Sequence, residues 1–206
     1  MQKNVPYNLV ALTAIEKISE LGITPSLQQK IGAFAICWGL FESHLESAIW
    51  ALQDENVNGN RPSTEKNTLS EWFACLANGH IDLPLGANAV LKDAAQAADN
   101  LMDYRHSLFH GMLVPIPGAP FFIRNPSWSG EMRKRKSGDA QVDENLLDMA
   151  IESAWILFRV AVLIKKAIKN NDKARDLENM KKDVLRARSF AGELRHLAEL
   201  MNHEKY

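Results

Sequence analysis

Residues 34–52, FAICWGLFESHLESAIWAL, carry the pattern on which the fold class depends. Large apolar side chains recur there at steps of three and four residues: Phe34, Trp38, Phe41, Leu45, Ile49 and Leu52. This spacing is typical of a helix that buries one face. Thr24 is a suitable N-cap and Pro25 a suitable first helical residue. We therefore expect a long helix from Pro25 to about Asp54 that packs into a core.

Further helices are expected from similar patterns, at about residues 7–21, 64–78, 87–110, 142–170 and 172–202. The last would turn a row of large apolar residues inward: Leu185, Phe190, Leu194, Leu197 and Leu200. Prolines and glycines exclude a helix over residues 112–140, where 113–114 and 121–123 are expected to form a hairpin. The chain is therefore expected to be all-α, an up-and-down bundle of roughly five or six helices with a small hairpin or loop insert. Residues 1–170 would form this bundle, and residues 171–206 a C-terminal helical extension that packs on it or on a partner.

The charge of the chain gives little overall attraction for nucleic acid or membranes, because the net charge of the 206 residues is −1. Its distribution is uneven. Residues 1–110 hold 7 Lys/Arg against 12 Asp/Glu, whereas residues 165–206 hold 11 against 7. The C-terminal part is therefore better suited to an anionic partner.

The sequence also bears on the cellular compartment. The longest apolar run, Ala33–Phe41, is too short to span a bilayer, and no apolar leader follows Met1. Cys37 and Cys75 lie in apolar surroundings without metal-type spacing, so we expect buried, reduced thiols. The expectation is a cytoplasmic protein with no membrane partner and no cofactor.

Residues 103–111, DYRHSLFHG, crowd polar side chains into the end of the 87–110 helix. Steps of four, three and four residues place a set of them on one stripe: Asp99, Asp103, His106 and His110. Arg105 lies beside the stripe. A solvated surface face is one interpretation. Two histidines four residues apart can also share a metal ion, but H-E-x-x-H is absent and all ligands would come from one helix, so no metal site is predicted.

A third interpretation uses Arg105 and His110 together to cleave RNA without a metal ion. Arginine is always charged and can hold a phosphate through two donors. Histidine can accept or donate a proton near neutral pH. Cleavage by the ribose 2′-hydroxyl needs a proton acceptor and a cation that stabilises the crowded phosphate. A dimer would bring two such pairs together.

These residues resemble the R-x4-H signature of the HEPN superfamily, with Arg105, polar His106 directly after it, and His110 at the helix end. Upstream, WGLFESHLESAIWAL (residues 38–52) is similar to the early HEPN helix. Downstream, His110 and Gly111 precede an apolar residue and a short extended segment, as is common in this superfamily. The resemblance covers about residues 30–168. It implies a dimeric helical bundle in which two motifs meet in a cleft.

The resemblance implies a metal-independent endoribonuclease that acts as a toxin or in antiviral defence. Arg105 would bind and polarise the scissile phosphate, His110 would transfer a proton or position the 2′-hydroxyl, and His106 would support both by hydrogen bonding. The implied partners are RNA, a second copy of the chain, and an antitoxin or other regulator. Two features depart from the family pattern. Met112 stands where some HEPN toxins carry a tyrosine that their antitoxin modifies, and the insert at 112–140 exceeds what a minimal domain needs.

Other charged residues have candidate supporting roles. Four consecutive cations, Arg133, Lys134, Arg135 and Lys136, fit a contact with the RNA backbone or a solvated loop. Glu42 is expected to approach Arg105 and hold it by an ion pair, or to be an exposed charge. Asp103, which lies on the polar stripe, is the second carboxylate expected to support the site. Two rival functions remain open: a non-catalytic HEPN-like protein that binds nucleic acid or a partner, and a structural helical protein whose stripe faces solvent.

Overall fold

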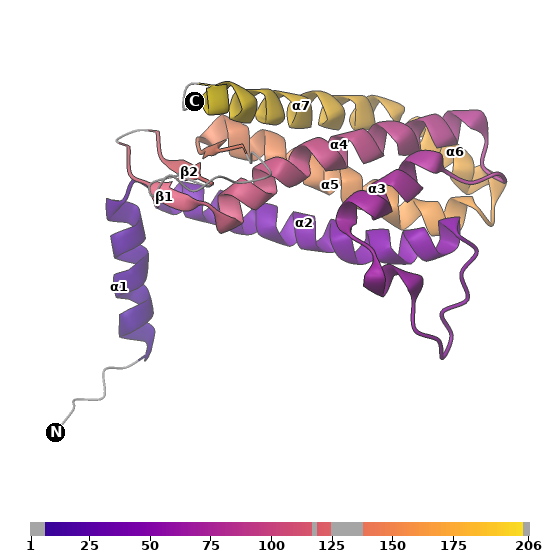
Figure 1. Ribbon diagram of the computed structural model, residues 1–206, viewed down its shortest axis with the longest axis horizontal. Coiled ribbons are helices and arrows are strands. Elements are labelled where there is room, and N and C mark those ends of the chain that lie inside the picture. Colours follow the sequence, from indigo (N-terminus) through magenta and orange to yellow (C-terminus); the bar gives the residue numbers. More distant parts are fainter. Residues whose placement is uncertain (1–6, 117–118, 125–137, 204–206) are drawn as a thin grey trace.

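The computed structural model describes residues 7–116, 119–124 and 138–203 and is mainly helical (Figure 1). Seven α-helices, a short 3₁₀ turn and three short strands lie within these residues. The all-α class expected from the sequence therefore holds in the broad sense, with a small antiparallel sheet added. No helix among the described residues combines the length and the apolar character that crossing a bilayer requires.

The longest helix, α2 (Pro25–Leu52), begins where the sequence predicts. Pro25 is its first residue, and the Thr24 side chain accepts a hydrogen bond from the Leu27 N–H. All members of the apolar stripe are buried: Phe34, Trp38, Phe41, Leu45, Ile49 and Leu52. They face a core shared with α5 (Glu144–Ala167), which lies alongside α2 (Figure 1). The Asp143 carboxylate caps α5 by accepting from the Leu146 N–H.

The second half of the bundle is formed by α4 (Leu85–His110) and α7 (Lys181–His203). The buried face of α4 is rich in alanine: Ala87, Ala94, Ala95, Ala97 and Ala98. The face that α7 buries is also mostly small: Val184, Ala187, Ala191, Leu194 and Ala198. The prediction that α7 buries a leucine-rich face is therefore wrong in part, because Leu185 and Leu200 are exposed. Alanines on both helices allow a close approach that larger side chains would prevent.

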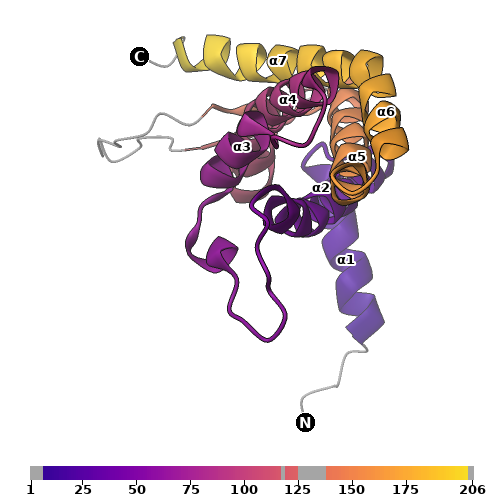
Figure 2. The same ribbon diagram turned by 90° about the vertical axis from the view of Figure 1, so that its right-hand side faces the viewer.

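Two helix boundaries differ from the expectation. A single helix over 172–202 was expected, but α6 (Asn171–Asn179) ends at Met180 and α7 then returns along α4 (Figure 2). Ala174, Leu177 and Met180 are buried at this corner, so the turn is stabilised by burial. The expected helix from residue 64 divides into a 3₁₀ turn, η1 (Ser63–Lys66), and α3 (Leu69–Asn78). A capping box between Thr68 and Glu71 starts α3.

The insert after α4 forms the expected hairpin and one strand more. β1 (Met112–Val114) pairs with β2 (Phe121–Ile123) in antiparallel register, with Met112 opposite Ile123. β3 (Ala140–Gln141) pairs with the other edge of β2 and was not expected. The sheet lies against the C-terminal end of α4, so it frames the place where the R-x4-H residues lie.

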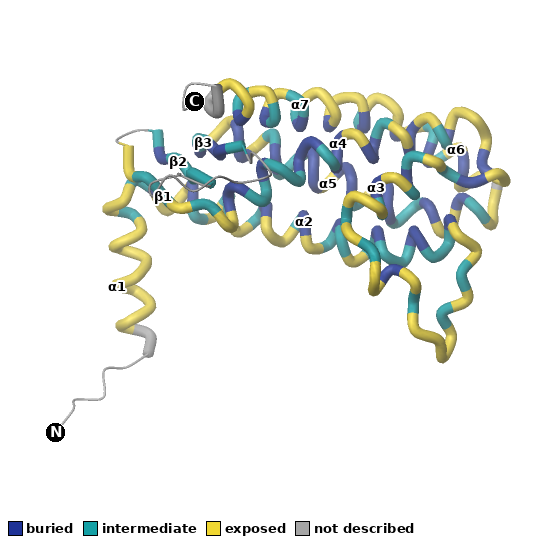
Figure 3. Tube along the Cα trace, viewed as in Figure 1, coloured by how far each residue is buried: buried dark blue, intermediate teal, exposed yellow. Residues whose placement is uncertain are grey.

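The first helix, α1 (Tyr7–Glu20), matches the expected range but stands away from the bundle (Figures 1 and 2). Nearly all of its described residues are exposed (Figure 3).

Candidate functional site

The C-terminal end of α4 is closed by a glycine that the packing requires. His110 is the last helical residue, and the Gly111 N–H donates to the Ser107 carbonyl oxygen at 2.8 Å. A Cβ at position 111 would clash with that same carbonyl oxygen and lie 3.0 Å from the Phe122 Cβ. Gly111 therefore allows β1 to start immediately after α4, with β2 packed against the junction.

Two buried hydroxyl groups attach α4 to the end of the insert. The Tyr104 hydroxyl donates to the Gln141 carbonyl oxygen at 2.9 Å. The Ser107 hydroxyl lies within hydrogen-bonding distance of the Asp103 and Gly138 carbonyl oxygens. Both side chains are almost fully buried. These contacts hold one face of α4 against the insert, and the neighbouring face carries the partly exposed His106 and the exposed His110.

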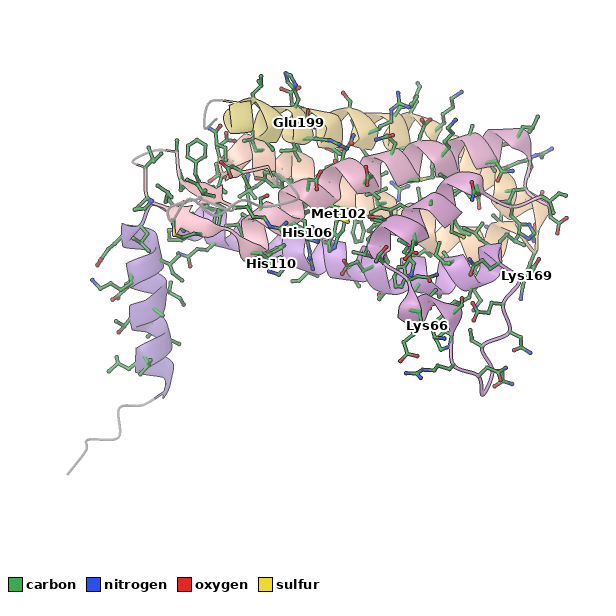
Figure 4. All side chains as sticks on the ribbon, in the orientation of Figure 1. Lys66, Met102, His106, His110, Lys169 and Glu199 are labelled. Atoms are coloured by element: carbon green, nitrogen blue, oxygen red, sulfur yellow. The ribbon has the colours of Figure 1, made fainter. Side chains whose placement is uncertain are left out.

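The two histidines of the motif are neighbours on this face. The ring centroids of His106 and His110 are 6.0 Å apart, with the ring planes at 51°. Figure 4 labels Met102, His106 and His110 one after another along α4. The structure therefore brings the two predicted site histidines together.

His106 is held in its neutral form. Partial burial, as the largest cause, and the positive charges of Arg105, Arg124 and His110 together lower its pKa to about 4. A neutral imidazole offers one N–H donor and one acceptor nitrogen. This state fits the expected supporting role by hydrogen bonding and does not fit a role as a cation.

Arg105 lies on the flank of α4 that faces α2. Its guanidinium carbon is 5.8 Å from the centroid of the Phe109 ring. Phe109 is in turn stacked on the buried Phe34 of α2, with centroids 6.0 Å apart and planes at 14°. Phe109, held in place by its stacking on Phe34, therefore makes a cation–π contact with Arg105.

Arg105 has no charged partner among the described residues. Its Nε atom is buried and forms no hydrogen bond with any of them. No carboxylate among the described residues forms an ion pair with it. The expected Glu42–Arg105 ion pair is thus absent, and Glu42 is a half-buried residue on α2. An arginine without a carboxylate partner retains its capacity to bind an anion.

Arg195 of α7 interacts with the aspartates of the polar stripe, and the sequence did not predict this contact. Arg195 donates to the Asp99 carboxylate at 3.3 Å and to the Asn100 side-chain oxygen at 3.0 Å. Burial raises the pKa of Asp103, and the charge of Arg195 opposes that rise. The polar stripe therefore has two parts. Its carboxylates interact with Arg195 of α7, whereas His106 is influenced by the charge of Arg105.

A second arginine, Arg124, belongs to the site and was not singled out from the sequence. It follows β2, and its backbone N–H donates to the Asp139 carboxylate at 3.0 Å. Its charge acts on both His106 and Asp103. The only sequence signal was a basic residue directly after the second hairpin strand. The four predicted RNA-backbone contacts, Arg133, Lys134, Arg135 and Lys136, lie outside the described residues.

Among the residues that the structure describes, no three His, Cys, Asp or Glu side chains gather as a metal-binding group. No protein-family model matches the chain, and neither a curated protein nor a solved structure matches it. The chemistry of the side chains at the end of α4 is therefore the basis for assigning a function.

Proposed function

We propose that this chain is a HEPN-type endoribonuclease that cleaves RNA without a metal ion. The observation that carries the proposal is the cluster at the end of α4: Arg105 pairs with no described carboxylate, its charge acts on His106, and the His106 ring lies next to the His110 ring. Arg124 adds a second positive charge to this cluster. The R-x4-H spacing, the helical architecture and the short extended segment after the motif support the same assignment.

In the proposed reaction the ribose 2′-hydroxyl attacks the adjacent phosphorus. His110 accepts the 2′-hydroxyl proton, and the bond from phosphorus to the 5′-oxygen breaks. The 5′-oxygen takes up a proton, which leaves a 2′,3′-cyclic phosphate and a 5′-hydroxyl. Arg105 stabilises the negative charge on the non-bridging oxygens of the pentacovalent phosphate. His106, neutral at physiological pH, donates or accepts a hydrogen bond beside them.

A homodimer is part of the proposal, because one copy supplies only one Arg105 and one His110. Two facing motifs would supply a proton acceptor for the 2′-hydroxyl and a proton donor for the 5′-oxygen. The basic run 133–136 would contact the RNA backbone. Such an enzyme fits a toxin or an antiviral effector in the cytoplasm, controlled by an antitoxin or another regulatory partner.

One observation favours a second candidate, a HEPN-like protein that binds nucleic acid without cleaving it. The His110 ring lies next to the His106 ring, but no described residue forms a hydrogen bond with it. A general base is normally oriented by a second hydrogen bond that fixes its tautomer. In this candidate Arg105 still binds phosphate, but His110 performs no proton transfer.

The test compares cleavage of a mixed-sequence RNA in EDTA by the wild type and by Arg105→Ala and His110→Ala. Loss of activity by about 100-fold or more is expected in both variants. Arg61→Ala and His196→Ala are matched controls, because both residues are exposed and neither belongs to the cluster. Circular dichroism melting curves check that each variant is folded.

Two other outcomes have distinct meanings. A wild type that binds RNA without cleaving it, with binding weakened by Arg105→Ala, would favour the non-catalytic candidate. Cleavage that survives both substitutions would show that the cluster on α4 is not the active site.

A further inference from the structure

α1 exposes apolar side chains that no other part of the described chain covers. Its large apolar residues are each at least 40% exposed: Leu9, Val10, Leu12, Ile15 and Ile18. The helix has 14 residues and projects from the bundle (Figures 1 and 3). A solitary helix of that length is marginal in water, and most helical stability comes from packing an apolar face. α1 therefore has the properties of a segment that packs against another surface.

The junction between α1 and α2 is well defined and holds α1 away from its own bundle. Gly22 adopts a φ of 94°, which favours glycine. The Gln28 side-chain amide donates to the Ser19 hydroxyl oxygen and to the Ile23 carbonyl oxygen, both at 2.9 Å. Ile23 itself is buried in the core. Folding α1 back onto its own α2 would break these contacts.

A matching surface exists on the outside of α2. We define the α2 outer face by its exposed positions from the start of the helix: Pro25, Ser26, Gln29, Gly32, Ala35, Ile36, Gly39 and Ser43. None of them is charged. Ile36 is 66% exposed, and a Cβ at Gly32 or Gly39 would have no atom within 4 Å. α1 projects on the side of the bundle that α2 forms, as both views show (Figures 1 and 2).

We propose that α1 is an exchanged arm: in a homodimer, α1 of each copy packs on the α2 outer face of the other copy. Because both halves of the contact are present on one chain, a two-fold axis satisfies both at once. α1 is about 21 Å long, and a stable interface buries roughly 800 Å² per partner, so the proposed dimer requires both reciprocal arms and not one alone.

The charges of α1 favour a second copy over a lipid surface. Interfacial membrane helices are rich in Lys and Arg on their polar face. In α1 the described charges are Glu16, Lys17 and Glu20, and Lys17 is paired with Glu20 at 2.6 Å. The sum is negative, so anionic lipid would repel the arm, whereas the uncharged α2 outer face would not.

The arm exchange can be tested independently of ribonuclease activity, because dimerisation is measured in the absence of RNA. It nevertheless places the dimer contact near the candidate site. A Cβ at Gly22, in the α1–α2 junction, would lie 3.9 Å from the Ile116 carbonyl oxygen and from the Pro120 Cβ. Both belong to the connection between β1 and β2.

The test is sedimentation equilibrium of the full chain over a range of concentrations. Wild type is expected to dimerise. Ile15→Glu with Ile18→Glu, and separately Ile36→Lys, are expected to raise the dissociation constant by at least about tenfold. Ile81→Lys is the matched control, because Ile81 is 95% exposed and lies between α3 and α4. All substituted positions are exposed, so the thermal unfolding transition of the helical bundle, followed by circular dichroism, should remain that of the wild type.

Mixing the two weakened variants tests the exchange itself. A heterodimer of the α1 variant and the Ile36→Lys variant has one wild-type contact and one contact that pairs glutamates with a lysine. Recovery of dimer on mixing is expected. A wild type that stays monomeric, a dimer that persists in both variants, or a mixture that stays monomeric would each overturn the proposal.

Discussion

The Tyr104 hydroxyl on α4 donates a hydrogen bond of 2.9 Å to the Gln141 carbonyl oxygen in β3. Thirty-seven residues separate the two positions in the chain, and Tyr104 is only 2% exposed. This contact joins the helix that carries the R-x4-H residues to the last strand of the insert. It therefore links the stability of the sheet to the orientation of the candidate site.

Tyr104→Phe removes this hydrogen bond while the ring remains packed against Phe34. We expect the free energy of unfolding to fall by about 1–2 kcal/mol, because the partly buried Gln141 carbonyl oxygen loses its donor. Urea denaturation measures the change. An unaltered midpoint with an unaltered m-value would contradict the structural role of the hydroxyl.

Gly111→Ala is expected to destabilise the fold by about 1–3 kcal/mol, because the added Cβ would meet the Ser107 carbonyl oxygen and the Phe122 Cβ. The matched control is Gly192→Ala in α7, where the new Cβ would lie 3.8 Å from the Asn100 side-chain nitrogen, an ordinary contact. That change should be neutral or stabilising by up to about 1 kcal/mol through helix propensity. Thermal melting compares the two, and equal melting temperatures would argue against close packing at Gly111.

His106 should titrate with a pKa of about 4 in the folded protein, against the usual value of about 6.5. Its folded-state pKa is depressed, so the unfolded chain binds the proton first as the pH falls. Stability is therefore expected to decrease between about pH 6.5 and 4 and to level off below that range. NMR titration of the His106 ring protons measures the pKa directly, with the urea-unfolded chain as the reference. A folded-state pKa at the unfolded value would contradict the burial of the ring.

Phe109→Leu removes the ring that supports Arg105 while it leaves the charge in place. The cation–π contribution at a partly exposed site is about 0.5–1 kcal/mol, so RNA affinity is expected to fall about two- to fivefold. Fluorescence anisotropy with a labelled RNA measures the affinity. Trp155→Leu provides a matched loss of an exposed aromatic ring on α5. An equal loss of affinity in the two variants would show that the ring beneath Arg105 has no specific role.

Much of the helical content was predictable from the sequence because its signals are local. The stripe from Phe34 to Leu52 and the cap at Thr24 predict α2 almost to the residue. The boundary of α4 at Gly111 was predictable for the same reason. β3 was not, since two residues are too few to show an alternating pattern. The turn at Met180 was also missed, because a continuous helical pattern runs through it.

The sequence by itself determined most of the helices, including the one that ends with Arg105, His106 and His110, but not the break at Met180. Only the tertiary structure decided which polar residues remain available there. Arg195 engages Asp99 across 96 positions of the chain, and Arg124 approaches His106 through the insert. The physical reason is that helix periodicity and caps depend on neighbours within a few residues. Burial, ion pairing and pKa shifts depend on which distant helices pack together.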